Sequence, residues 1–225
     1  MRPAAPEDAD EVGRVQAQVF IDTYAARLPP ETVAAFDPRA FAQGWRAALS
    51  RPAEGVNQLL VALDENDRIV GLAAVGPSQD PDTGQSTGEV TLVAVHPLAR
   101  RRGHGSRLLN AVVEVLRDAG ADLVTAWLPA DAEQERAFLL AAGFAPDGAY
   151  RDRVVSADGA VMREVRVDAA LTEPSPSVGA GGIGAGGIGA GGIGAGGIEA
   201  GGIEAGGIEA GGIEAGGIEA GGGGG

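Results

Sequence analysis

The chain has 225 residues, with 17 basic against 31 acidic side chains and a formal net charge of −14. Every basic residue is an arginine, and the chain contains no cysteine. These absences exclude a Schiff-base lysine, a lysine-containing phosphate loop, a thiol nucleophile, a disulfide framework and a thiolate metal site. The only histidines are His96 and His104, so no metal site is expected. The negative charge argues against nucleic acid or an anionic membrane as a partner.

The composition divides the chain into a domain over residues 1–170, a linker over 171–178 and a tail over 179–225. The tail holds 25 of the 38 glycines and repeats G-A-G-G-I, later E-A-G-G-I, every five residues. Because a period of five forms no continuous apolar face on a helix or a strand, we predict a disordered tail. It is either an assembly segment or an expanded repeat without a selected role.

The N-terminus is acidic within ten residues and lacks the apolar segment of a secretory signal. Residues 174–198 carry no charge, but they are mostly glycine and alanine and fall short of the apolar content that a membrane span needs. We therefore expect a soluble, cytoplasmic protein without a membrane partner.

The first 50 residues predict two helices. Valines at positions 12, 15 and 19 have helical spacing within residues 7–23, behind acidic residues suited to a helix N-terminus. Asp37 followed by Pro38 is typical of a capped helix start. The helix that follows places Phe41, Trp45 and Leu49 on one face.

The remainder of the domain alternates strands and helices. Strands are predicted over 58–63, 68–75 and 89–95, with a polar turn at 64–67 and a loop at 77–88. A helix follows the basic turn at 100–105 and ends before Gly120, and a strand covers 123–128. Asp131 and Gln134 predict a capping box for a helix that ends near Ala142. The last two strands are 144–155 and 161–167. Helices between strands imply crossovers, hence a mixed α/β sheet.

The stretch that is informative about function links the strand at 89–95 to the helix after residue 105. A buried strand enters a basic, glycine-containing turn, and the helix begins there. Main-chain amides at a helix start, the helix dipole and nearby arginines together make an anion site. A dinucleotide-binding G-x-G-x-x-G pattern would need glycine where Leu108 stands, so that alternative is weak.

Here the sequence resembles the GNAT N-acetyltransferase superfamily. Arg100-x-x-Gly103-x-Gly105 matches its acyl-CoA signature [QR]-x-x-G-x-[GA], and Val95-His96-Pro97 is its usual lead-in. Ala142-Gly143-Phe144 resembles the end of the family's last helix, and Arg2-Pro3-Ala4 its opening. The resemblance covers roughly residues 1–170. It implies a central twisted mixed sheet flanked by helices.

The resemblance also implies acetyl-CoA as co-substrate. In the family, the strand that matches residues 89–95 diverges from its neighbour to take the pantetheine arm, and the pyrophosphate sits on main-chain amides of the turn. The implied binding residues are Val93, Ala94, Val95, Arg100, Arg101, Arg102, Gly103, His104, Gly105 and Ser106. The implied reaction is acetyl transfer to a primary amine of a small molecule or peptide, in a monomer or a homodimer.

Three departures from the family pattern bear on catalysis. Leu139 stands where members often carry a tyrosine as general acid, so Tyr24 and Tyr150 are the candidate substitutes, although most tyrosines are packing residues. An asparagine common near the start of the same helix is absent. Met1 falls where the first strand should be under way, so that strand is a stub or the start lies elsewhere.

The resemblance also implies a general base, since many family members use an acid at the head of this strand to take the amine proton, often through water. Glu89 is the candidate at that position, and an exposed strand-end carboxylate without a catalytic role is the equal alternative. The second functional hypothesis, favoured by Leu139, is a module that binds acyl-CoA without turnover and assembles through the tail.

Overall fold

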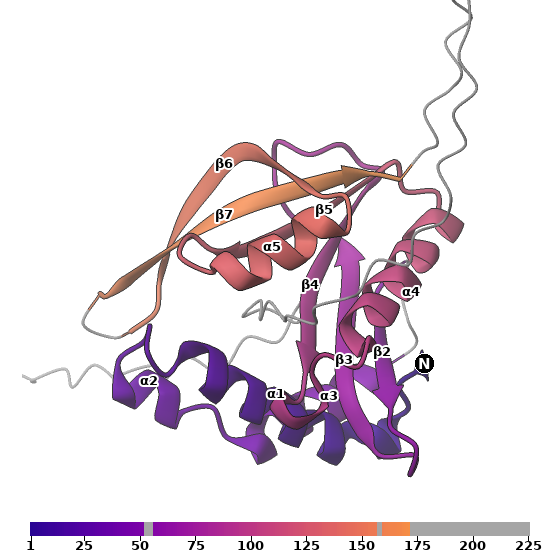
Figure 1. The fold of residues 1–225 in the computed structure, drawn as a ribbon, viewed down its shortest axis with the longest axis vertical. Helices are drawn as coiled ribbons and strands as arrows, with labels where there is room; N and C mark the ends of the chain where they lie inside the picture. The colour runs from indigo at the N-terminus through magenta and orange to yellow at the C-terminus, as the bar shows by residue number, and fades with distance from the viewer. Residues whose placement is uncertain (52–55, 157–158, 172–225) are drawn as a thin grey trace, which may run out of the picture.

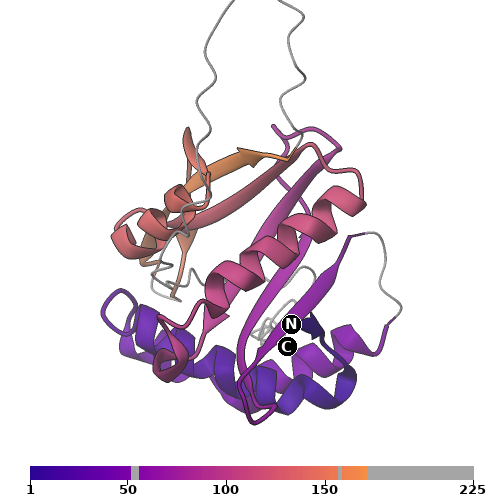
Figure 2. The ribbon, with the colours of Figure 1, turned by 45° about the vertical axis from the view of Figure 1, so that its right-hand side comes forward.

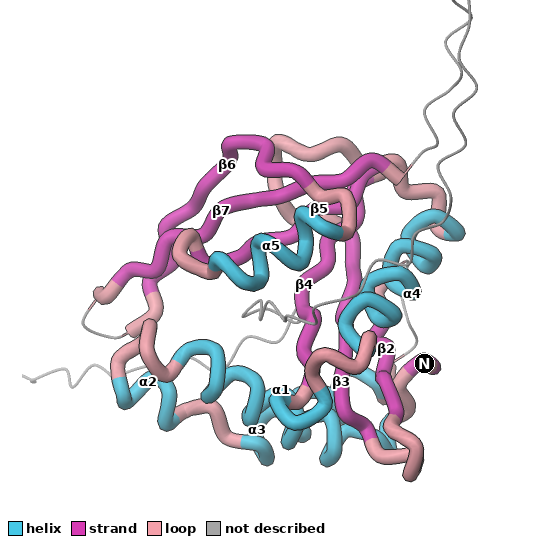
Figure 3. Tube along the Cα trace, in the orientation of Figure 1, coloured by secondary structure: helices cyan, strands magenta, loops and turns pink. Residues whose placement is uncertain are grey.

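The computed structural model describes residues 1–51, 56–156 and 159–171. The tail predicted over 179–225 and, apart from Leu171, the predicted linker lie outside the described residues. The described chain forms a seven-stranded sheet in the order β1-β2-β3-β4-β5-β7-β6 (Figure 3). The strands are β1 Arg2–Pro3, β2 Gln58–Leu63, β3 Ile69–Pro77, β4 Thr87–Val95, β5 Leu123–Pro129, β6 Ala145–Val154 and β7 Val161–Ala170.

Helices cover both faces of this sheet (Figures 1 and 2). On one face, α1 and α3 bury an aromatic and aliphatic cluster against β2, β3 and β4, and on the other α4 and α5 bury a second cluster. None of the helices in the described ranges has the length and apolar character needed to cross a membrane. The helices are α1 Ala9–Tyr24, α2 Pro30–Ala34, α3 Pro38–Leu49, α4 His104–Asp118 and α5 Glu133–Ala141, with single 3-10 turns η1 Pro6–Asp8 and η2 Pro97–Ala99.

The feature that positions the site is the short pairing of β4 with β5. All other neighbouring strands are antiparallel, whereas β4 and β5 are parallel and pair only over residues 87–90 and 123–126. Beyond these residues the two strands diverge, as Figure 1 shows. Thr91 is the extra residue of a β-bulge, because Ala74 pairs with Leu92 and Val75 with Val90. A bulge bends and twists a strand, which directs β4 away from β5. The mixed sheet predicted from the sequence is confirmed.

Most predicted elements are confirmed, including the Asp37 cap, whose carboxylate accepts a hydrogen bond from the Arg39 amide at 2.9 Å. The predicted capping box at Asp131 is wrong. Helix α5 begins at Glu133 after Ala132 and has no side-chain cap. The Asp131 carboxylate instead accepts from Nε of Arg27 at 3.1 and 3.2 Å, across 104 residues of sequence.

The first and shortest elements also differ from the prediction. Strand β1 is the expected stub: Arg2 pairs with Val61, and Pro3 with Leu60. Helix α2, which begins directly after Pro29, was not predicted from the sequence. Strand β4 begins at Thr87, two residues earlier than predicted, because its start pairs with β5.

Candidate active site

The turn before α4 presents a row of unpaired main-chain amides. Gly103 precedes the helix with a φ of 79°, and Arg101 has a φ of 62°, so the chain turns through two left-handed residues. Glycine at 103 cannot supply a side-chain cap. Within the described ranges, the main-chain amides of residues 101–106 donate no hydrogen bond. Consecutive free amides at a helix N-terminus form an anion-binding concavity.

The side chains of this turn divide into two groups. Arg100 donates from Nη1 to Asp22 at 2.6 Å and from Nε to the Val95 carbonyl at 3.4 Å, so its guanidinium lies against the domain. Arg101 and Arg102 are exposed. Of the predicted basic triplet, these two extend into solvent beside the free amides.

His104, in the first turn of α4, is 9% exposed. Burial lowers its pKa, and the charges of Arg107 and Arg102 lower it further. Its Nδ1 lies 3.3 Å from Nη2 of Arg107. Both effects favour the uncharged form of the His104 ring, which lies beside the turn.

A hollow opens where β4 leaves β5. Leu139, at the position of the family tyrosine, contributes an apolar wall, and a methyl group built on Gly105 would lie 3.6 Å from Phe138 and 3.9 Å from Val95. The head of α4 therefore adjoins the hollow. The lining residues are Val90, Thr91, Val93, Ala126, Trp127, Phe138 and Leu139.

The three predicted strand residues point to the two opposite faces of β4. Val93 and Val95 both pack in the cluster under α4, and Val93 also lines the hollow. The Ala94 side chain is buried in the cluster on the α1 face, so only the main chain of Ala94 is available to the space between β4 and β5. This alternation follows from the two-residue period of a strand.

Glu89 lies on the paired part of β4, opposite Thr125 of β5, one residue before the strands begin to diverge. It is half-buried. Burial raises the pKa of Glu89, and the charge of Asp80 raises it further, against the opposing charges of Arg151 and Arg153. A carboxylate with a raised pKa near a hollow is suited to accept a proton.

The two candidate tyrosines lie in different environments. Tyr24 is fully buried at the end of α1, and burial raises its pKa, as do the charges of Glu164 and Glu135. Tyr150 is 64% exposed and lies under the Arg163 guanidinium, 4.8 Å from its ring centroid. Tyr150 is on the face of the β6–β7 hairpin away from Glu164, and the structure does not bring it to Glu89.

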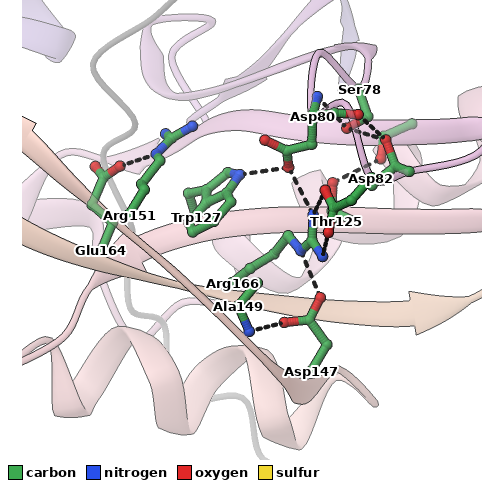
Figure 4. Close-up of polar contacts among 12 residues, drawn as sticks. Ser78, Asp80, Asp82, Thr125, Trp127, Asp147, Ala149, Arg151, Glu164 and Arg166 are labelled. Atoms are coloured by element: carbon green, nitrogen blue, oxygen red, sulfur yellow. Dashed lines mark hydrogen bonds and ion pairs between the residues drawn. The ribbon is translucent and has the colours of Figure 1, made fainter.

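A polar cluster surrounds Trp127 and was not predicted from the sequence (Figure 4). Arg166 is 7% exposed and binds three carboxylates: Asp147 at 2.5 Å, Asp82 at 2.7 Å and Asp80 at 3.2 Å. Asp80 also accepts from Nε1 of Trp127 at 2.9 Å. The cluster ties the loop after β3 to the β6–β7 hairpin.

A second ionic group lies on the other side of the Trp127 ring. Glu164 is 1% exposed and accepts from Nε of Arg151 at 2.6 Å and from Nε and Nη2 of Arg153 at 3.3 Å. The signal that could have found these residues is the alternation Arg-x-Arg in β6 and Glu-x-Arg in β7, which places each pair on one face of a strand. In the part of the chain that the structure describes, no group of three or more metal-ligating side chains is arranged to hold an ion.

The fold of this chain is similar to that of several solved structures. One similar structure is the ribosomal-protein-alanine N-acetyltransferase from Brucella melitensis, 23% identical, with a TM-score of 0.56 over 75% of this chain and 98% of that one. Another is yncA from Salmonella typhimurium, determined with its cofactor acetyl-CoA, at 20% identity and a TM-score of 0.56 over 76% and 93%. A third is the PaiA N-acetyltransferase from Thermoplasma acidophilum in complex with coenzyme A, at 12% identity and a TM-score of 0.57 over 75% and 96%.

These identities establish the shared fold, and no curated protein matches the sequence. A family model adds direct evidence. The model for the acetyltransferase (GNAT) family matches residues 20–144, more than half of the chain, and includes the amide-rich turn and the diverging strands. This protein belongs to the acetyltransferase (GNAT) family.

Proposed function

We propose that this protein is an acetyl-CoA-dependent N-acetyltransferase that acetylates a primary amine of a small molecule or peptide. The observation that carries the proposal is the continuity of three features: the unpaired amides of residues 101–106, the adjoining hollow and the half-buried Glu89. The amides would hold the pyrophosphate, with Arg101 and Arg102 beside it. The pantetheine arm would occupy the hollow between the diverging strands.

The chemistry that fits this arrangement is direct transfer. The nitrogen of the acceptor amine attacks the thioester carbonyl, a C–N bond forms, the C–S bond breaks, and the electron pair leaves with the thiolate. The amine proton passes to the Glu89 carboxylate, directly or through water. A thiol with a pKa near 8.5 is a tolerable leaving group without a general acid, so Leu139 is compatible with turnover. Proximity supplies much of the remaining acceleration.

Measurement of thiol release from acetyl-CoA across a panel of amines tests the proposal. The alternative is a module that binds acyl-CoA without turnover and assembles through its tail, and the apolar Leu139 in the wall of the hollow favours it. Release that depends on an added amine supports the enzyme. Tight acetyl-CoA binding with no release on any amine leaves the binding module.

Glu89→Gln should lower turnover about 10–100-fold below the pKa of the acceptor amine, within the usual range for general-base catalysis. There the amine is protonated and needs the carboxylate, whereas at higher pH the free amine reacts without it. Because the pKa of Glu89 is raised, the wild-type rate should fall as the pH drops through a value above that of an ordinary glutamate. Steady-state pH profiles check this, with Glu133→Gln, an exposed carboxylate on α5, as the control. An equal loss at every pH would contradict the assignment of a base.

A further inference from the structure

The Trp127 ring separates two regions of opposite charge (Figure 4). On one side, the guanidiniums of Arg151 and Arg153 both bind the carboxylate of Glu164, so two basic side chains contact one acidic side chain. We call this region, made of Arg151, Arg153 and Glu164, the basic side. On the other side, three carboxylates surround the single guanidinium of Arg166, which leaves a formal charge of −2.

We call this second region the acidic side; it consists of Arg166 with Asp80, Asp82 and Asp147. Glu89 adds a further carboxylate near it, and the charge of Asp80 is the largest charge effect on Glu89. All these strand residues share the face of the sheet that bears Trp127. The strand register shows this, because paired residues lie on the same face of a sheet, as do residues two apart in one strand. Trp127 pairs with Arg166, and Arg151 pairs with Glu164. Glu89 pairs with Thr125, two residues before Trp127. The two charged regions therefore flank one ring beside the proposed site of transfer.

The Arg151 side chain is held in place through Nε, while its Nη groups remain available as hydrogen-bond donors. Its Nε is bound to Glu164, and its guanidinium lies over the Trp127 ring, 4.3 Å from the centroid. The side chain is 35% exposed. Among the described residues, its Nη1 and Nη2 donate no hydrogen bond. An oriented guanidinium with two free Nη groups matches the geometry of a planar carboxylate.

Arg153 does not offer the same opportunity. Its Nε and Nη2 both turn to Glu164, and its side chain is 19% exposed. It places a second guanidinium against the buried carboxylate of Glu164. Arg151 is therefore the residue of the basic side that can bind a further anion.

We propose that the acceptor is a zwitterion of the amino-acid class, with its carboxylate on Arg151 and its ammonium group toward Glu89 and the acidic side. This inference rests on the proposed function, since the ammonium nitrogen is the one acetylated. The two charged regions would align the acceptor across the Trp127 ring, next to the point where β4 and β5 diverge. Arg151 is thus assigned as a specificity-determining residue.

The test compares three probes that differ in one group: an L-amino acid, its carboxamide and the corresponding decarboxylated amine, across several side chains. For the wild type, kcat/KM in thiol release from acetyl-CoA should be at least about tenfold higher for the amino acid, the discrimination expected from about 1.4 kcal/mol. In Arg151→Gln, KM for the amino acid should rise at least tenfold with little change in kcat. The preference of the enzyme for the amino acid over its carboxamide should disappear in this variant.

Arg163→Gln is the matched control. Arg163 lies on the same hairpin, binds a carboxylate (Asp152) through Nε at 2.7 Å and lies over a ring (Tyr150), but on the other face. It should leave the acceptor preference unchanged. Arg151→Lys keeps a positive charge near Glu164 and should recover stability and part of the affinity, which separates recognition from folding.

Two readouts distinguish failure of this inference from failure of the proposed function. Acetyl-CoA affinity should be the same in Arg151→Gln as in the wild type. Calorimetric titration of the three probes into the CoA-loaded protein reports the acceptor preference even without turnover. Equal use of all three probes by the wild type, no preferential binding of the amino acid, or an equal effect of Arg163→Gln would overturn the zwitterion assignment. Absence of acetyl-CoA binding would instead overturn the proposed function.

Discussion

Gly105→Val is expected to weaken acetyl-CoA binding by about 100-fold or more, equivalent to about 2.8 kcal/mol, while the domain stays folded. A side chain at this position would point toward the tip of the Phe138 ring and toward Val95, where the head of α4 meets the hollow. It would narrow the path that joins the free amides to the space between the strands. Since the nearest atoms belong to side chains, at ordinary contact distance, the substitution is compatible with the fold.

Titration calorimetry with acetyl-CoA measures the loss of affinity, and thermal melting shows whether the domain stays folded. Gly105→Ala should give a smaller loss of affinity in the same direction. Gly103→Val should weaken acetyl-CoA binding for a different reason, which is backbone strain in the turn and not a narrowed path. A branched side chain at a φ of 79° strains the backbone by about 1–3 kcal/mol. Gly84→Val is the control, since its added carbon would meet only Thr87, at 3.9 Å. Wild-type affinity in a folded Gly105→Val protein would refute the assigned binding path.

Gly13→Ala is expected to destabilise the domain by about 3 kcal/mol, although helix propensity alone predicts stabilisation by about 1 kcal/mol. Gly13 lies in α1 where α3 crosses it. An added carbon would lie 2.5 Å from the Pro38 carbonyl oxygen and 2.6 Å from the Ala42 nitrogen. Both are main-chain atoms, so the two helices must separate, which disturbs the buried hydrogen bond from Trp45 to Gln16.

Thermal melting distinguishes the two expectations by sign. For a domain of this size, about 3 kcal/mol lowers the melting temperature by roughly 6–12 °C. Gly84→Ala, in the open loop after β3, serves as the control and should melt within about 2 °C of the wild type, because its change in free energy should stay near 0.5 kcal/mol. A higher melting temperature for Gly13→Ala would show that α1 and α3 are not packed at this distance.

The helices and strands were predictable because each depends on a short stretch of sequence. The valines of α1, the Asp37 cap of α3 and the continuous apolar runs of β2 and β3 all lie within short stretches of sequence. The turn before α4 was predictable for the same reason, since Arg100 to Gly105 is one continuous motif. The diverging strands followed from the resemblance that this motif carries, and the register of β4 and β5 confirms them.

The ion pairs were not predictable in the same way. Asp131 has the sequence of a helix cap but binds Arg27, and Asp80 and Asp82 have the sequence of a solvated loop but bind Arg166. These partners lie 84–104 residues apart. A charged side chain has many partners of opposite sign in an acidic, arginine-rich chain. Only the register of the sheet and the path of the loops decide which of them it meets.

By itself, the sequence determined the class of the sheet, the order of its elements, the anion-binding turn and the membership of a family that this turn signals. The tertiary structure decided which side chains share a face: Glu89 beside Trp127, Arg151 over its ring, and Tyr150 turned away. The physical reason is the range of the interactions. Helix caps, turns and periodic apolar faces form between near neighbours in the chain, whereas the proposed acceptor side of the site is assembled from β4, β5, β6, β7 and the loop after β3.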